Sequence, residues 1–165
     1  MKRKNILLFL MMVLWLAACQ EKVEYPIEPR ITNQGIAYVI DADSTLTGEV
    51  ILSIGYTDGD GDLGLDDNDT LYPFGVKDPH YYNLIVDYIG PNDTLDFSAR
   101  FKRLVFDDEV KAISGTMEYK MMLLNPLSPH DSIQLRVHII DRALHESNTI
   151  ETPVISFAPL GRNNH

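Results

Sequence analysis

Apolar and polar residues alternate in four separate segments, and this alternation limits the possible fold more than any other feature of the sequence. The four segments are residues 50–57, 82–88, 117–123 and 133–139. In the first of them Val50, Leu52 and Ile54 occupy every second position. A period of two places one apolar face along a half-buried β-strand. We therefore expect each of these segments to form a strand.

Three further segments complete an all-β prediction. We expect a first strand near residues 35–40, a short one near 101–106 and a last one over 148–157, where Pro153 indicates a sheet edge or a bulge. The segment 99–113 is also compatible with a short helix, although we favour a strand. About seven strands separated by turn-rich segments predict a single antiparallel β-sandwich with immunoglobulin-like architecture.

The N-terminus has the three parts of an export signal. Residues 2–4 are basic, residues 6–15 are apolar, and small residues precede Cys19. The uncharged stretch, residues 5–18, is shorter than the roughly 20 residues that a transmembrane helix needs. We therefore predict that residues 1–18 are a cleaved signal peptide.

The sequence Leu16-Ala17-Ala18-Cys19 resembles the lipobox of bacterial lipoproteins. This resemblance implies that the Cys19 thiol receives diacylglycerol, that a peptidase cleaves before Cys19, and that the new amine is acylated, for example with palmitate. Two or three acyl chains give a stable membrane anchor. Because Cys19 is the only cysteine, no intramolecular disulfide can form, so the exported domain must be held together by its core or by a metal ion.

A short tether separates the anchor from the folded part. Residues 19–30 contain Pro26 and Pro29 among charges, without an apolar period. We place the β-sandwich domain at residues 31–160. The start of the tether, residues 20–24, resembles the export tag of surface lipoproteins from Bacteroidetes-like bacteria. We expect an outer-membrane lipoprotein, with its domain at the cell surface or on the periplasmic side.

The mature chain is strongly acidic. Cleavage removes three of the 14 Lys and Arg residues, which leaves 11 against 24 acidic residues and a formal charge of −13. Such a surface repels nucleic acid and attracts cations. We therefore expect no nucleic-acid partner.

Carboxylates are concentrated directly after the predicted strand at residues 50–57. Residues 58–69 include six aspartates, which would repel one another without a counter-ion. Ca²⁺ takes six to eight oxygen ligands, and alternate aspartates in a loop that contains glycine can direct successive carboxylates to one centre. Mg²⁺ fits less well, because it keeps its waters and requires a strict octahedron. The predicted ligands are Asp58, Asp60, Asp62, Gly64 through its backbone carbonyl, Asp66 and Asp69.

This loop departs from the helix-flanked calcium-loop pattern at two positions. Leu63 stands where that pattern has glycine, and Asp69 replaces the longer glutamate at the end. No helices are predicted on either side, which favours a calcium loop that joins strands in an extracellular β-module. The alternative is a solvated turn that binds nothing, since aspartate and glycine are common in turns for backbone reasons.

A second segment adds one candidate ligand by resemblance. Residues 139–148 are similar to the turn near the end of immunoglobulin-like and cadherin-like extracellular modules, which implies that Asp141 joins the calcium loop. The chain resembles small lipoproteins of Bacteroidetes-like bacteria in five features taken together. These are the lipobox, the aspartate loop, residues 82–84, residues 115–116 and residues 141–148. That resemblance implies no activity.

No recognised catalytic constellation is present. The sequence has no Gly-x-Ser-x-Gly, no glycine-rich phosphate loop and no His-x-Glu metal spacing, so we expect a protein that is not an enzyme. Two other functions remain open. The domain is either a binding or accessory module for a polysaccharide, a peptide or an envelope protein, or a structural lipoprotein that assembles with other proteins.

Aromatic residues near the aspartate loop bear on this choice. These residues are Tyr72, Phe74, Tyr81 and Tyr82. Exposed aromatic rings would suit stacking on sugars, whereas buried rings would belong to the core of the sandwich. The exposure of these four rings therefore discriminates between the two functions.

Overall fold

The computed structural model describes residues 24–40, 47–89, 95–104, 111–124 and 132–156, which form strands and no helix. The strands are β1 (Arg30–Ile40), β2 (Thr47–Asp58), β3 (Leu84–Tyr88), β4 (Ile113–Leu124), β5 (Ser132–Ile133), β6 (Leu135–Ile139), β7 (Ile150–Glu151) and β8 (Ile155–Ser156). The prediction of an all-β chain is confirmed.

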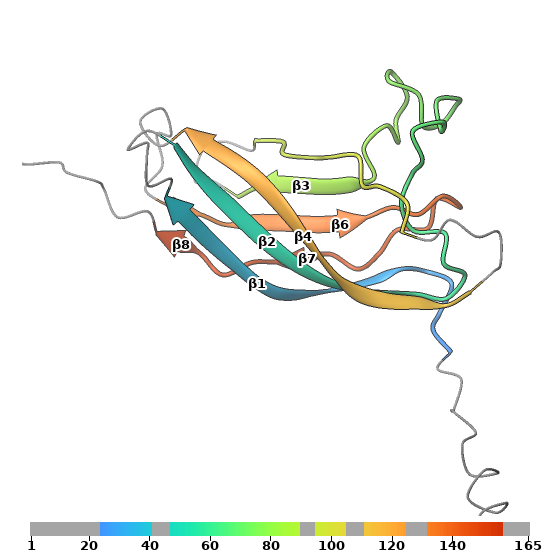
Figure 1. Cartoon of the computed structure of the whole chain (residues 1–165), viewed down its shortest axis with the longest axis horizontal. Coiled ribbons are helices and arrows are strands. Elements are labelled where there is room, and N and C mark those ends of the chain that lie inside the picture. The colour runs from blue at the N-terminus through green and yellow to red at the C-terminus, as the bar shows by residue number, and fades with distance from the viewer. Residues whose placement is uncertain (1–23, 41–46, 90–94, 105–110, 125–131, 157–165) are drawn as a thin grey trace, which may run out of the picture.

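The strands form two main sheets that lie in two layers (Figure 1). One sheet has the order β1-β2-β4 and the other the order β3-β6-β7, with antiparallel neighbours throughout. A small antiparallel pair, β5-β8, is added at one end. In Figure 1, β2 and β6 both end at the right-hand end of the sandwich, although they belong to different layers.

The predicted alternation produces the core. Completely buried apolar side chains from the central strands of the two sheets are Val50, Leu52, Ile54, Leu135, Val137 and Ile139. They belong to one cluster, in which the inner faces of both sheets pack together. Hydrophobic burial across this interface therefore holds the two layers together.

The first strand is longer than predicted, because a bulge hides its pattern. β1 starts at Arg30, and its register with β2 shifts between Asn33 and Gly35. Gly35 has a φ of 154°, in the region that glycine adopts most readily. An inserted residue breaks the alternation of period two, so residues 30–34 do not look like a strand in the sequence.

Two predicted strands are replaced by shorter pieces. In place of a strand at residues 101–106, the described part of this region makes isolated bridges, including Leu84 with Ala99 and Leu65 with Lys102. Residues 105–110 lie outside the described residues. The last predicted strand is divided into β7 and β8, with Pro153 between them. Proline has no backbone N–H to donate, which accounts for the interruption.

Candidate metal centre

The candidate site begins where β2 ends. Asp58, the last residue of β2, is completely buried. Its Oδ2 accepts a hydrogen bond from the backbone N–H of Leu63 at 3.1 Å. This bond folds the following residues back over the end of the strand, and the Oδ1 atom of Asp58 stays inside the resulting turn.

Glycine and leucine determine the path of this turn. Gly61 has a φ of 73°, and a side chain there would collide with the carbonyl oxygen of Lys111. Leu63 is completely buried in the core, and Leu65 is almost completely buried. The position that holds glycine in helix-flanked calcium loops is therefore a core contact in this chain, which fixes the turn onto the sandwich.

Asp141 reaches the same place from the other sheet. It follows β6, is completely buried, and begins a tight turn that continues to His145. Asp141 Oδ1 accepts a hydrogen bond from the backbone N–H of His145 at 2.7 Å, and Oδ2 lies 2.9 Å from His145 Nδ1. Leu144 has a φ of 69°, which closes the turn. Both oxygens of Asp141 are therefore held in place by a single neighbour.

Four carboxylates converge between these two turns. Asp58, Asp60, Asp62 and Asp141 each offer an oxygen, and these four oxygens lie within 4.8 Å of one another. Ca²⁺–O distances of roughly 2.3 to 2.6 Å place opposite ligands about 4.6 to 5.2 Å apart, so the four oxygens fit around one such ion. The turns after β2 and β6 thus form a candidate cation site that bridges the two layers.

Three of these carboxylates have an oxygen that is buried and has no hydrogen-bond partner among the described residues. These atoms are the Oδ1 atoms of Asp58, Asp60 and Asp62. A buried polar atom without a partner is costly, and a buried charge without a partner more so. Three such atoms in one cluster are accounted for when a cation lies between them.

The electrostatics of the cluster also indicate that these carboxylates need a cation. Burial raises the pKa of Asp58 to about 7, and the negative charges of Asp60 and Asp62 act in the same direction. Burial also raises the pKa of Asp62 to about 6, together with the charges of Asp141 and Asp60. Burial raises the pKa of Asp141, against the hydrogen bonds from His145. Without a counter-ion, the charged forms of Asp58, Asp62 and Asp141 are disfavoured.

No protein-family model, curated protein sequence or solved structure matches the chain significantly. The chemistry of the site therefore rests on its own residues and geometry.

The structure does not bring Asp66 and Asp69 to the other predicted ligands. Asp66 Oδ2 pairs with Arg103 Nη1 at 3.1 Å, and Asp69 Oδ1 pairs with Arg142 Nη2 at 3.2 Å. Asp69 Oδ2 also accepts the backbone N–H of Asp66 at 2.7 Å. Arginine charges neutralise these two carboxylates, so they need no metal ion.

Gly64 explains this separation. Its φ of 95° and its close approach to the backbone of Lys102 redirect the chain after Leu63. The backbone N–H of Leu65 then bonds to the carbonyl of Phe101 at 2.9 Å, and Arg103 N–H bonds to the carbonyl of Leu65 at 3.2 Å. The chain thus follows the ligand pattern of a helix-flanked calcium loop only as far as Asp62. In that pattern Gly64 would offer its carbonyl, but here the residues after Asp62 bond to residues 101–103.

Arg100 is a structural residue near the site that the sequence analysis missed. Its Nη2 donates to the carbonyl oxygens of Asp66 and Asp69 at 2.8 and 2.7 Å. Its Nη1 donates to the carbonyls of Phe74 and Tyr81 at 3.1 and 3.3 Å. One guanidinium thus ties together the ends of the loop at residues 66–81, and no sequence pattern signals contacts with backbone carbonyls.

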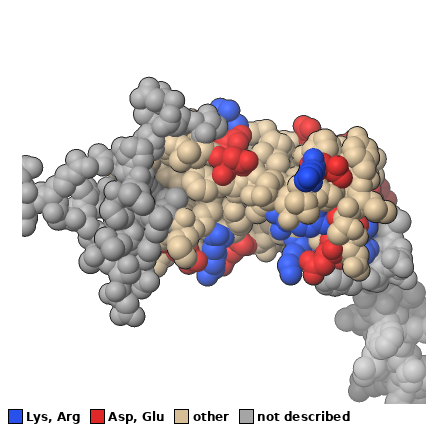
Figure 2. Space-filling view, turned by 90° about the horizontal axis from the view of Figure 1, so that it is seen from above, with Lys and Arg blue, Asp and Glu red and all other residues tan. Residues whose placement is uncertain are grey.

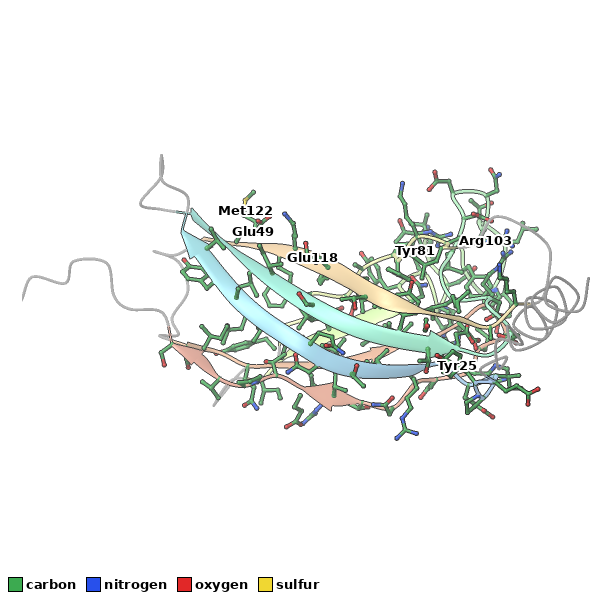
Figure 3. The ribbon with its side chains drawn as sticks, turned by 60° about the horizontal axis from the view of Figure 1, so that its bottom comes forward. Tyr25, Glu49, Tyr81, Arg103, Glu118 and Met122 are labelled. Carbon is green, nitrogen blue, oxygen red and sulfur yellow. The ribbon has the colours of Figure 1, made fainter. Side chains whose placement is uncertain are left out.

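Charged side chains gather at this end of the molecule. Figure 2 shows basic and acidic side chains side by side at its right-hand end, and Figure 3 places Arg103 and Tyr81 there as well. Arg142 follows Asp141 directly in the chain and pairs with Asp69, so it connects the two turns. In the sequence, the position of Arg142 next to Asp141, a predicted ligand, was the one signal for this connecting role.

The aromatic residues near the loop are divided between exposed and half-buried positions. Tyr72 is 80% exposed and Tyr82 is 44% exposed, whereas Phe74 and Tyr81 are half-buried. The rings of Tyr81 and Tyr82 meet edge to face with centroids 4.9 Å apart. None of the four belongs to the buried core cluster.

The predicted anchor residue, Cys19, lies outside the described residues. Within the described part of the chain, no helix has the length and apolar character needed to cross a membrane.

Proposed function

We propose that this chain is an exported, lipid-anchored protein whose β-sandwich binds one Ca²⁺ ion and acts as a binding or accessory module of the cell envelope. The observation that carries the proposal is the convergence of four aspartates, three of which have buried oxygens without hydrogen-bond partners among the described residues. Asp58, Asp60, Asp62 and Asp141 supply the ligands, and water or backbone oxygens complete a shell of six to eight. We keep the immunoglobulin-like assignment of the sandwich as part of this proposal.

The ion has a structural role in this proposal. It joins the turn after β2 to the turn after β6, and these strands lie in different layers. A chain with one cysteine cannot link its layers with a disulfide. Calcium supplies a comparable link, and the binding free energy adds to the stability of the folded state.

Thermal unfolding with calcium and with chelator tests this proposal. At a hundredfold excess over Kd, Ca²⁺ stabilises the domain by about 2.7 kcal/mol, and the melting midpoint rises by several degrees. Asp60→Asn removes one ligand and relieves repulsion among the remaining carboxylates. This variant therefore loses the calcium response, while its midpoint in chelator equals or exceeds that of the wild type.

Asp67→Asn is the matched control, because Asp67 is exposed and lies outside the four-carboxylate cluster. It keeps the full calcium response. Equal midpoints of the wild-type protein in calcium and in chelator would remove the metal from the proposed function. A response to Mg²⁺ equal to that to Ca²⁺ would change the identity of the ion.

The anchor is tested separately. We expect Cys19 to carry diacylglycerol and acyl chains, so intact-mass measurement of the membrane-extracted protein gives the mass of the chain from Cys19 onward plus lipid. The Cys19→Ser variant, expressed in the same host, loses this lipid and leaves the membrane fraction. An unmodified cysteine in the wild-type protein would contradict the anchor while leaving the metal site untouched.

For the ligand of the module, we propose only a chemical class. Tyr72 and Tyr82 are exposed on and beside the loop that Arg100 ties together, which supports a polysaccharide or an envelope protein as partner.

A further inference from the structure

The two outer edges of the β1-β2-β4 sheet differ in how they are protected. The β1 edge contains the bulge at Gly35 and is capped by Asn148, whose side chain bonds to both the N–H and the carbonyl of Ile31. In the described part of the chain, the β4 edge has neither device. β4 pairs with β2 over its entire length without a shift in register, and among the described residues no backbone hydrogen bond joins its other edge to another segment.

A long, regular edge strand is a template for pairing with another strand, and proteins protect such edges by bulges, prolines or covering segments. β4 runs over Ile113–Leu124 and contains no proline. Its inner face is anchored in the core by Met117 and Met121. The strand is therefore anchored in the core, and no segment among the described residues hydrogen-bonds along its outer edge.

The charges of β4 select one partner. Glu118 and Lys120 are both exposed on the outer face of the sheet, two residues apart, and Lys120 Nζ also lies 3.8 Å from Glu49 Oε2 of β2 in the same copy. In an antiparallel pair of identical strands, a twofold axis passes through one residue and its copy. With the axis at Tyr119, Glu118 lies opposite Lys120 of the second copy, and the reverse pair forms on the other side of the axis.

The same charges disfavour the two neighbouring registers. An axis at Glu118 places two glutamates opposite each other, and an axis at Lys120 does the same with two lysines, both of which are unfavourable. The axis at Tyr119 also aligns residues 114–124, which is nearly all of β4. The register with matching charges is thus also one of almost complete overlap.

We propose that two copies of this chain associate through their β4 edges, antiparallel and with the twofold axis at Tyr119, to form one continuous sheet of six strands. In Figure 3, Glu49, Glu118 and Met122 lie along this side of the molecule, away from Arg103 and Tyr25 at the metal end. The inference is independent of the proposed calcium function.

Charge reversal tests the register. Native mass spectrometry of the full chain, released from detergent at micromolar concentrations, shows dimers for the wild type. Glu118→Lys and Lys120→Glu each place like charges opposite one another at both rungs, and each raises the dimer dissociation constant by about tenfold or more. The double variant Glu118→Lys/Lys120→Glu restores the opposite pairs and returns the constant to within about twofold of the wild-type value.

The matched control is the exposed ion pair between Arg136 and Glu151, whose atoms are 3.0 Å apart within one copy. Arg136→Glu, Glu151→Arg and their combination leave the dimer unchanged. Circular dichroism establishes that all variants are folded. A monomeric wild type, or a dimer that persists in both single β4 variants, or a double variant that stays dissociated, would overturn the proposal.

Discussion

At the scale of single residues, the four aspartates of the candidate site destabilise the metal-free protein, and their arrangement suits a cation. Asp58 is completely buried, yet its Oδ1 atom has no hydrogen-bond partner among the described residues. His145 holds both oxygens of Asp141, in the way that outer residues orient the ligands of a metal ion. The same four carboxylates therefore have opposite effects on stability without and with calcium.

The pH dependence of the chelated protein follows from these residues. The pKa values of Asp58 and Asp62 are raised from 3.8 to about 7 and about 6, so the folded state binds more protons than the unfolded state between these limits. Hydrogen bonding to Asp141 also raises the pKa of His145, which acts in the same direction. The free energy of unfolding in chelator therefore falls as the pH rises from about 4 to about 7.

Urea unfolding in chelator at several pH values measures this effect. Excess calcium reverses the trend, because the ion competes with protons and binds the deprotonated carboxylates. A metal-free protein whose stability increased steadily from pH 4 to 7 would contradict the assigned burial of these aspartates.

At the scale of elements, the turn after β2 depends on Gly61. Its φ of 73° is strained for any residue with a side chain, and a methyl group there meets the carbonyl of Lys111. We expect Gly61→Ala to destabilise the domain by about 2 kcal/mol, from backbone strain and the contact with the neighbouring backbone. Calcium affinity falls as well, because Asp60 and Asp62 flank this residue.

Gly35→Ala provides the comparison for this prediction. Gly35 also has a positive φ, 154°, but a side chain there meets no atom within 4 Å, and the residue lies in the bulge of β1. Its replacement costs stability through strain alone and leaves the calcium affinity as it was. Chemical denaturation and calcium titration of both variants measure the difference. Equal loss of calcium affinity in the two would show that the turn at Gly61 does not shape the site.

Much of each element could be predicted, because local patterns determine it. The alternation at residues 50–57 and 133–139 marks buried faces of β2 and β6, and the spacing of Asp58, Asp60 and Asp62 marks the turn. The arginine pairs of Asp66 and Asp69 were not predictable, since Arg103 and Arg142 come from distant segments. The bulge in β1 was not predictable for a different reason, because one inserted residue interrupts the local alternation of period two.

At the scale of the whole molecule, we propose that one calcium ion links two sheets that no disulfide can join. The hydrophobic core already joins them, so the ion adds to a folded structure and does not create it. Its contribution is concentrated at the end where β2 and β6 terminate, which is also where the exposed loop with Tyr72 begins. In our proposal, calcium therefore binds next to the part of the module that meets its partner.

Titration calorimetry of Ca²⁺ into the chelated and desalted wild-type protein tests this claim most directly. At neutral pH we expect one ion per chain, with protons released as Asp58 loses the proton that its raised pKa retains. The number of protons is obtained by repeating the titration in buffers of different ionisation heat. One bound ion with proton release is the predicted result, and the absence of saturable binding at millimolar calcium would contradict the account.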